Sequence, residues 1–168
     1  MKASPKIHSI YIATRAGESM APLMQANIIA GEGIMGDRYA LGIGAFSKTK
    51  LKIRHISLIA LAGLEYANQQ LKTKQQASFA ESETRRNLAI SGISAEELNS
   101  LVGKTFYLGN LAFKGTELCE PCQRPANLLK RPDFMNVFEG RGGLRAEALT
   151  SGTLSSGDLL TYSIGHEQ

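Results

Sequence analysis

The chain has little cysteine, no tryptophan and no long apolar run. Two cysteines in 168 residues are too few for the disulfide framework of a small secreted domain, and a chain of this length can bury a core without cross-links. No stretch approaches the run of about 18 apolar residues that indicates a membrane-spanning helix. The opening residues, MKASPKIHSIYIATRAG, lack the apolar segment of a signal peptide. We therefore expect a cytoplasmic protein with reduced thiols and no membrane partner.

A strong excess of charge of one sign is also absent. The net charge is +4, and hydrophobic residues make up 43% of the chain against 20% charged residues, which is typical of a single globular domain over residues 1–168. The basic residues are scattered and do not alternate with the five tyrosines and six phenylalanines. This pattern argues against a nucleic-acid partner and is compatible with an anionic small molecule.

Seventeen glycines are spread through the chain and break it into short apolar runs, which favours a β-rich domain. Residues 6–13 alternate as a strand does, and residues 104–118 are typical of a hairpin with Gly109 and Asn110 at its turn.

A helix is expected over residues 60–71 and another after the capping box of Ser94 and Glu97. Strands and helices do not alternate one to one, which argues against a doubly wound parallel sheet. The pattern predicts a mainly β fold of the α+β class: a closed or nearly closed antiparallel β-barrel with peripheral helices.

The two cysteines, Cys119 and Cys122, stand two residues apart in LCEPCQRP. A structural zinc site needs about four ligands, and His8, His55 and His166 lie far away without ligand-like spacing. The pair alone therefore predicts no zinc site. Packing of two small, inert side chains is the simplest alternative.

A thioredoxin-like pair requires a long helix after the first cysteine, inside a βαβ unit. Pro125 and Pro132 interrupt the segment that follows the cysteines. The remaining hypothesis is one working thiolate, as a soft metal ligand or a sulfur carrier. Nearby Arg124 and Arg131 would favour its ionisation, and a single cysteine would need an organic cofactor to complete the coordination of a metal.

Glycine-rich turns and arginines offer candidate anion sites. GEGIMG fits the spacing G-x-G-x-x-G, but no helix is expected after it, so we discard a dinucleotide site. In ETRRNLAISG, Arg85 and Arg86 would face opposite sides of a strand, and an inward arginine beside Asn87 would suit a phosphate or carboxylate. The motifs around Arg38 and Arg141 allow the same interpretation.

Five segments in this order resemble the MOSC family, named after the C-terminal domain of molybdenum-cofactor sulfurases. They are GIMGDRYALGIGAFS, ETRRNLAISGI, LVGKTFYLGNLAF, LCEPCQRPANLL and GRGGLRAEALTSGTLSSGDLL. The likeness runs from about residue 6 to 162 and suggests a stand-alone, bacterial-type member, a single MOSC domain over residues 1–168.

The resemblance implies a MOSC-type β-barrel that binds the molybdenum cofactor (molybdopterin), a pterin dithiolene with a phosphate. It implies Cys122 as the molybdenum ligand, with Cys119 an additional thiol of undefined role and both as catalytic candidates. The pterin would supply two further sulfurs. No pyridoxal-phosphate site of its own is expected. The cofactor-binding residues implied are Asp37, Arg38, Arg86, Asn87, Arg141, Gly142 and Gly143.

Three functions follow as hypotheses. The first is an oxidoreductase that reduces N-hydroxylated compounds with electrons from a partner reductase. The second is a sulfur carrier that holds a persulfide on Cys122 or Cys119, supplied by a separate cysteine desulfurase. The third is a non-catalytic module that binds a pterin or another anion.

Overall fold

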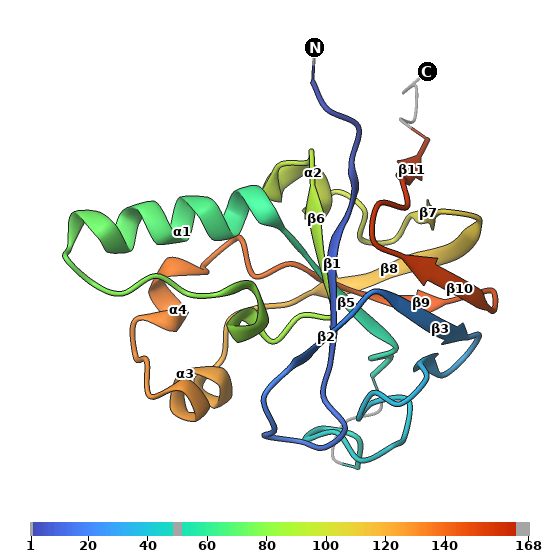
Figure 1. Cartoon of the computed structure of the whole chain (residues 1–168), viewed down its shortest axis with the longest axis horizontal. Helices are drawn as coiled ribbons and strands as arrows, with labels where there is room; N and C mark the ends of the chain where they lie inside the picture. Colours follow the sequence, from blue (N-terminus) through green and yellow to red (C-terminus); the bar gives the residue numbers. More distant parts are fainter. Residues whose placement is uncertain (1, 49–51, 164–168) are drawn as a thin grey trace.

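The structure is a computed structural model that describes residues 2–48 and 52–163 (Figure 1). Most of its strands belong to one eight-stranded sheet. In sheet order these are β11 (Leu160–Tyr162), β7 (Thr105–Leu108), β8 (Leu111–Leu118), β9 (Leu144–Ala148), β5 (Ile56–Ala60), β6 (Leu88–Ser91), β1 (Lys6–Ile12) and β2 (Ala21–Leu23). A three-stranded sheet holds β10 (Gly152–Ser155), β3 (Gln25–Ile29) and β4 (Gly33–Ile34).

The large sheet is curled into a half-barrel that is open, not closed, between β11 and β2. Backbone hydrogen bonds join the start of β1 to residues 157–160, for example from Leu160 to the Pro5 carbonyl at 2.9 Å, but only one isolated bridge, Lys6 with Leu159, forms there. The predicted mainly β, α+β fold is therefore confirmed, whereas the expected closure of the barrel is not observed.

The sheet is also not wholly antiparallel. β5 and β6 run parallel, with Leu58 opposite Leu88, because the chain returns through helix α1 (Leu61–Thr73) before β6 begins. Parallel neighbours need such a crossover. The other helices are short: the 3-10 helix η1 (Glu81–Thr84), α2 (Ala95–Asn99), α3 (Gln123–Leu129) and α4 (Phe134–Val137). No helix among the described residues is long and apolar enough to cross a membrane.

The alternation of side chains along the strands separates two apolar cores. Leu58, Leu88 and Leu144 point into the half-barrel and belong to its main core. Ile59 and Ala89 face the other side of the sheet, where they pack against α1, α4 and Phe79. Helices α1, α3 and α4 lie together at one end of the sheet (Figure 1). Where this helical layer leaves the outer face of the sheet uncovered, polar side chains take the place of apolar ones.

Candidate functional site

A row of polar side chains crosses the outer face of the sheet. Glu117 of β8 pairs with Arg145 of β9, and Arg145 pairs with Ser57 of β5. Asn87, just before β6, follows in the same row, and its Oδ1 accepts hydrogen bonds from the Ser57 backbone N–H at 3.0 Å and the Ser57 hydroxyl at 3.1 Å. Because side chains alternate along a strand, the same strands supply apolar residues to the core and this polar row to the opposite face.

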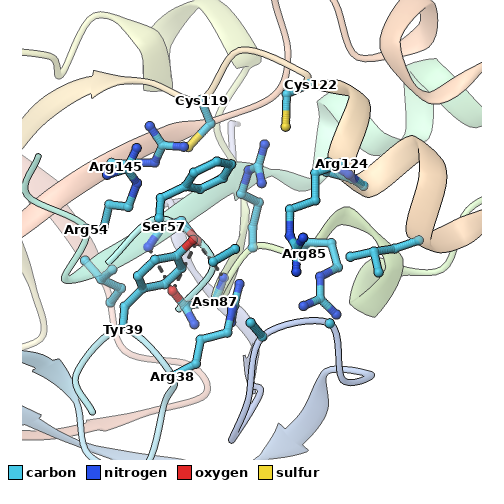
Figure 2. Close-up of a pocket in the computed structure, with 18 of the residues that line it drawn as sticks. Arg38, Tyr39, Arg54, Ser57, Arg85, Asn87, Cys119, Cys122, Arg124 and Arg145 are labelled. Atoms are coloured by element: carbon cyan, nitrogen blue, oxygen red, sulfur yellow. Dashed lines mark hydrogen bonds between the residues drawn. The ribbon is translucent and has the colours of Figure 1, made fainter. Parts of the chain in front are cut away.

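A cavity opens over this row (Figure 2) and encloses about 680 Å³ with its open mouth. Its walls come from the loop after β1, residues 38–46 and 54–57, the η1–β6 junction, the segment after β8, α3 and β9. The described residues of its lining include six arginines and one acidic residue, Glu120. The arginines are Arg38, Arg54, Arg85, Arg86, Arg124 and Arg145.

Both cysteines line the cavity (Figure 2). Cys122 is exposed and precedes the first residue of α3. Cys119 is only 2% exposed, and its backbone N–H donates to the Gly143 carbonyl at 2.8 Å. Gly142 lies so close that a Cβ there would stand 2.1 Å from the Cys119 carbonyl oxygen. Gly142 and Gly143 thus position the cysteine segment through their backbone, and neither lines the cavity.

Asp37 is fully buried behind the cavity wall, and its hydrogen bonds hold the segments of that wall together. Its carboxylate accepts from the backbone N–H groups of Ala13 and Tyr39, both at 3.2 Å, and from Arg38 Nη1 at 3.2 Å. The Asn87 amide donates to it at 3.4 Å and to the Tyr11 carbonyl at 3.1 Å. Asp37 and Asn87 therefore fix the strands and Arg38 relative to one another, with most of their own hydrogen-bonding capacity already used.

Arg86 and Arg141, both expected to bind a cofactor, lie in different surroundings. Arg86 lines the cavity and donates from Nε to the Gly142 carbonyl at 2.7 Å. Arg141 is outside the cavity, where its guanidinium lies 4.2 Å from the centre of the Tyr66 ring and donates to the Val137 carbonyl. Its contacts connect the loop before β9 to α1 and α4.

Of the cavity arginines, Arg85 and Arg124 were expected near an anion and near the thiols, although not as cofactor-binding residues, whereas Arg54 and Arg145 were not expected at all. Arg54 and Arg145 come from segments far apart in the chain, and an isolated arginine carries no local signal for a shared site. The alternation in LRAEA, which puts Arg145 opposite the core side chains of β9, is the one sequence signal for either of them.

Positive charge is concentrated at one side of the cavity. Burial, together with the charges of Arg38 and Arg124, lowers the pKa of Arg85 to about 10. Its guanidinium donates to the Glu18 carbonyl, which carries no full negative charge. Such a group is stabilised by an anion.

At the other side, Arg145 donates to Glu117 Oε1 at 2.7 Å. Burial alone would lower the pKa of Arg145, but the nearby Cys119 and Glu117 together raise it. The Cys119 sulfur lies beside this guanidinium (Figure 2).

The donor set for a metal is small. Within residues 2–48 and 52–163, no three or more His, Cys, Asp or Glu side chains are grouped so that they could hold a metal ion. His166, considered with the zinc hypothesis, lies outside the described residues. A metal at the cavity would therefore need ligands beyond these side chains.

Comparison with solved structures shows the same fold in several bacterial proteins. YuaD from Bacillus subtilis has a TM-score of 0.73 at 20% identity, over 94% of each chain. YiiM from Geobacillus stearothermophilus has a TM-score of 0.68 at 14% identity, over 95% of this chain and 75% of that one. YiiM from Escherichia coli has a TM-score of 0.66 at 13% identity, over 100% of this chain and 72% of that one.

No curated protein matches the sequence. The family model of the MOSC domain matches residues 35–161, which contain both cysteines and all six cavity arginines. That span is most of the chain, and it agrees with the resemblance found in the sequence motifs. The chain belongs to the MOSC domain family.

Proposed function

We propose that this domain binds the molybdenum cofactor in the arginine-lined cavity, with the Cys122 thiolate as molybdenum ligand, and that it reduces N-hydroxylated compounds with electrons from a separate reductase. The family is associated with molybdenum-cofactor binding. The observation that carries the proposal is one exposed thiol, Cys122, on the wall of a cavity lined by six arginines.

The residues present fit this cofactor chemically. A soft thiolate suits molybdenum, and a dithiolene would supply the sulfurs that the described side chains lack. The uncompensated charge around Arg85 and Arg124 suits the phosphate of a pterin, because guanidinium groups bind phosphate through charge-assisted hydrogen bonds. Arg38 and Arg86 also line the cavity, where Asp37 and the Gly142 carbonyl hold them.

When bound, the cofactor would supply oxygen-atom transfer chemistry. The work of the chain itself is to ligate, orient and neutralise. Cys122 supplies a thiolate at the cavity wall, and the arginines offset the negative charge of the bound group. Asp37 and Asn87 keep the strands beneath the cavity in register, so that these groups are held before a ligand arrives.

Molybdenum content tests the proposal. Protein made in a host that synthesises the cofactor should contain about one molybdenum per chain, and Cys122→Ser should lose it. Cys119→Ser is the matched control and should retain molybdenum, because Cys119 is nearly buried. Full loading of Cys122→Ser would contradict the proposal. Loading without reduction of N-hydroxylated compounds by any electron donor would instead indicate a non-catalytic binding module.

The presence of Cys119 and Cys122 on one cavity favours a second candidate, a sulfur carrier. A cysteine desulfurase and free cysteine would supply the sulfur, which one thiol holds as a persulfide and the other releases by attack. Incubation with both should then add about 32 Da to the chain, the mass of one sulfur atom, and the adduct should be lost on reduction. An unchanged mass would contradict this candidate.

A further inference from the structure

Arg54 carries two buried donors that no group in the described residues satisfies. These atoms, Nε and Nη1, are the buried side-chain nitrogens without a hydrogen-bond partner there. A buried donor without an acceptor is costly, and more so when it is charged. The guanidinium lies over the Phe46 ring, 5.2 Å from its centre. A guanidinium pairs best with a planar acceptor such as a carboxylate, which takes two of its N–H groups at once.

No carboxylate among residues 2–48 and 52–163 serves Arg54. Glu117 is near this side of the cavity, but its Oε1 accepts from Arg145 at 2.7 Å and its Oε2 from Lys52 at 3.0 Å. The one acidic residue of the lining, Glu120, makes no ion pair within the described residues. Arg54 therefore lines the cavity with a charge and two donors that have no acceptor within the described residues.

The arginines of the cavity form two groups. Arg85 is coupled electrostatically to Arg38 and Arg124, whereas Arg145 is coupled to Cys119 and Glu117. In Figure 2 Arg54 and Arg145 lie together on the Cys119 side, and Arg85 and Arg124 lie on the Cys122 side. A phosphate bound by Arg85 and Arg124 would leave Arg54 without an acceptor. A second anionic group is therefore needed to satisfy Arg54.

We propose that Arg54, supported by Arg145, forms a carboxylate-binding subsite that selects substrates with a negatively charged, planar group. The preferred substrate is then an N-hydroxylated compound that also carries a carboxylate, held on the Cys119 side while Cys122 serves the cofactor. The substrate part of this inference rests on the proposed function, but the carboxylate subsite does not, because it requires only the chain.

Benzoate is a suitable probe, since it combines a carboxylate for the guanidinium edge with a ring that can pack against Phe46. Titration calorimetry on the full chain without cofactor should show one benzoate per chain. Arg54→Met should weaken the affinity for benzoate at least about tenfold. Arg54→Lys should weaken it less, because lysine keeps the positive charge but lacks the planar pair of N–H donors that matches a carboxylate. Arg15→Met, which removes an exposed arginine outside the lining, should leave the affinity unchanged.

Folding of the variants can be judged separately. Arg54→Met removes an unsatisfied buried charge, so without benzoate it should melt no lower than the unmodified chain. Arg85→Met should keep benzoate affinity within about threefold, since Arg85 belongs to the other arginine group. Unchanged benzoate affinity in Arg54→Met would overturn the proposal.

Cofactor loading separates this inference from the proposed function. If Arg54→Met loads molybdenum normally but no longer prefers a carboxylate-bearing N-hydroxylated substrate to its neutral analogue, the proposed function and the carboxylate subsite are both supported. If the unmodified chain takes no molybdenum but binds benzoate through Arg54, the proposed function fails and the subsite stands. If Arg54→Met cannot load molybdenum while Arg85→Met can, Arg54 serves the cofactor and the substrate subsite is wrong.

Discussion

Gly143 shows how closely single residues set the geometry behind the cavity. Its φ of +91° lies in the region that favours glycine, and a Cβ there would stand 1.9 Å from the Leu58 carbonyl oxygen. The close approach brings β9 against β5, and the Gly143 carbonyl holds the Cys119 N–H at 2.8 Å. Backbone conformation at this one position therefore decides where the cysteine segment lies.

Gly143→Ala should lower the free energy of unfolding by more than about 1 kcal/mol, the cost of the left-handed backbone alone, because the methyl group also collides with backbone. Gly140→Ala is the matched control: φ there is +72°, and no atom lies within 4 Å of the added Cβ. Urea denaturation of both variants checks the difference. Equal losses would mean that the contact with Leu58 relaxes freely.

Asp37 is a second residue on which the site depends, because it is the shared acceptor of four donors. Asp37→Ala should lower the free energy of unfolding by about 3–5 kcal/mol, since removal of one partner leaves the buried Arg38 charge uncompensated. Asp37→Asn, which keeps an acceptor oxygen, should lose less. Urea denaturation measures both, and a loss below about 1 kcal/mol for the alanine variant would contradict this role.

Among the elements, β5 and β9 are joined by a side chain as well as by their ladder. His55, just before β5, accepts from the Ala148 N–H through Nδ1 at 3.1 Å. Burial lowers the pKa of His55, although Glu147 and Glu32 act in the opposite direction. A histidine whose pKa is lower in the folded chain favours folding while it is neutral. This stability is present above the unfolded pKa of about 6.5 and is lost as the pH falls through the folded value.

The free energy of unfolding should therefore fall between about pH 7.5 and about pH 5, and fall less in His55→Gln, which cannot titrate. Urea denaturation of both proteins at the two pH values gives the difference directly. The other titrating groups are common to both proteins, so their contributions cancel. Parallel pH profiles would show that His55 is not a source of the pH dependence.

Elements whose signals are local could be predicted from the sequence. The capping box of Ser94 and Glu97 does begin α2, with the Glu97 N–H donating to Ser94 Oγ at 3.1 Å, and Gly109 does turn the β7–β8 hairpin. The strand expected through Arg85 was wrong, because η1 ends there and Arg85 has a left-handed φ of +64°. Glu83 caps the other end of this short helix, where it accepts from the Ala80 N–H at 2.8 Å, and this local hydrogen bond outweighs the alternating pattern.

The site could be predicted only where its chemistry is local. The two cysteines stand in one short segment and could be predicted as candidate site residues, and both line the cavity. Arg124 lies in that same segment, whereas Arg54 and Arg145 could not be found, because only the sheet order brings their segments to the cysteines. Arg141 shows the converse: a basic residue in a suggestive glycine-rich motif stacks on Tyr66 away from the cavity.

For the whole molecule, charge is distributed unevenly. The chain carries a net charge of +4, yet among the residues that the structure describes six arginines and one acidic residue line a single cavity. Two of these arginines have carboxylate partners, Arg38 in Asp37 and Arg145 in Glu117. Such a cavity concentrates anions, and an anion that binds only the folded chain stabilises it by mass action.

Inorganic phosphate should therefore raise the melting temperature of the cofactor-free protein more than sodium chloride of equal ionic strength does. At ten times its dissociation constant it would add about 1.4 kcal/mol, or about 3–6 °C for a domain of this size.

Arg85→Met should change two quantities in opposite directions. Without phosphate it should melt higher, because a charge desolvated beside Arg38 and Arg124 is gone. With phosphate its shift should be smaller than that of the unmodified chain, because one of the groups that bind the anion is missing. Thermal melts with and without phosphate decide the matter, and an undiminished phosphate shift in Arg85→Met would show that the anion binds elsewhere.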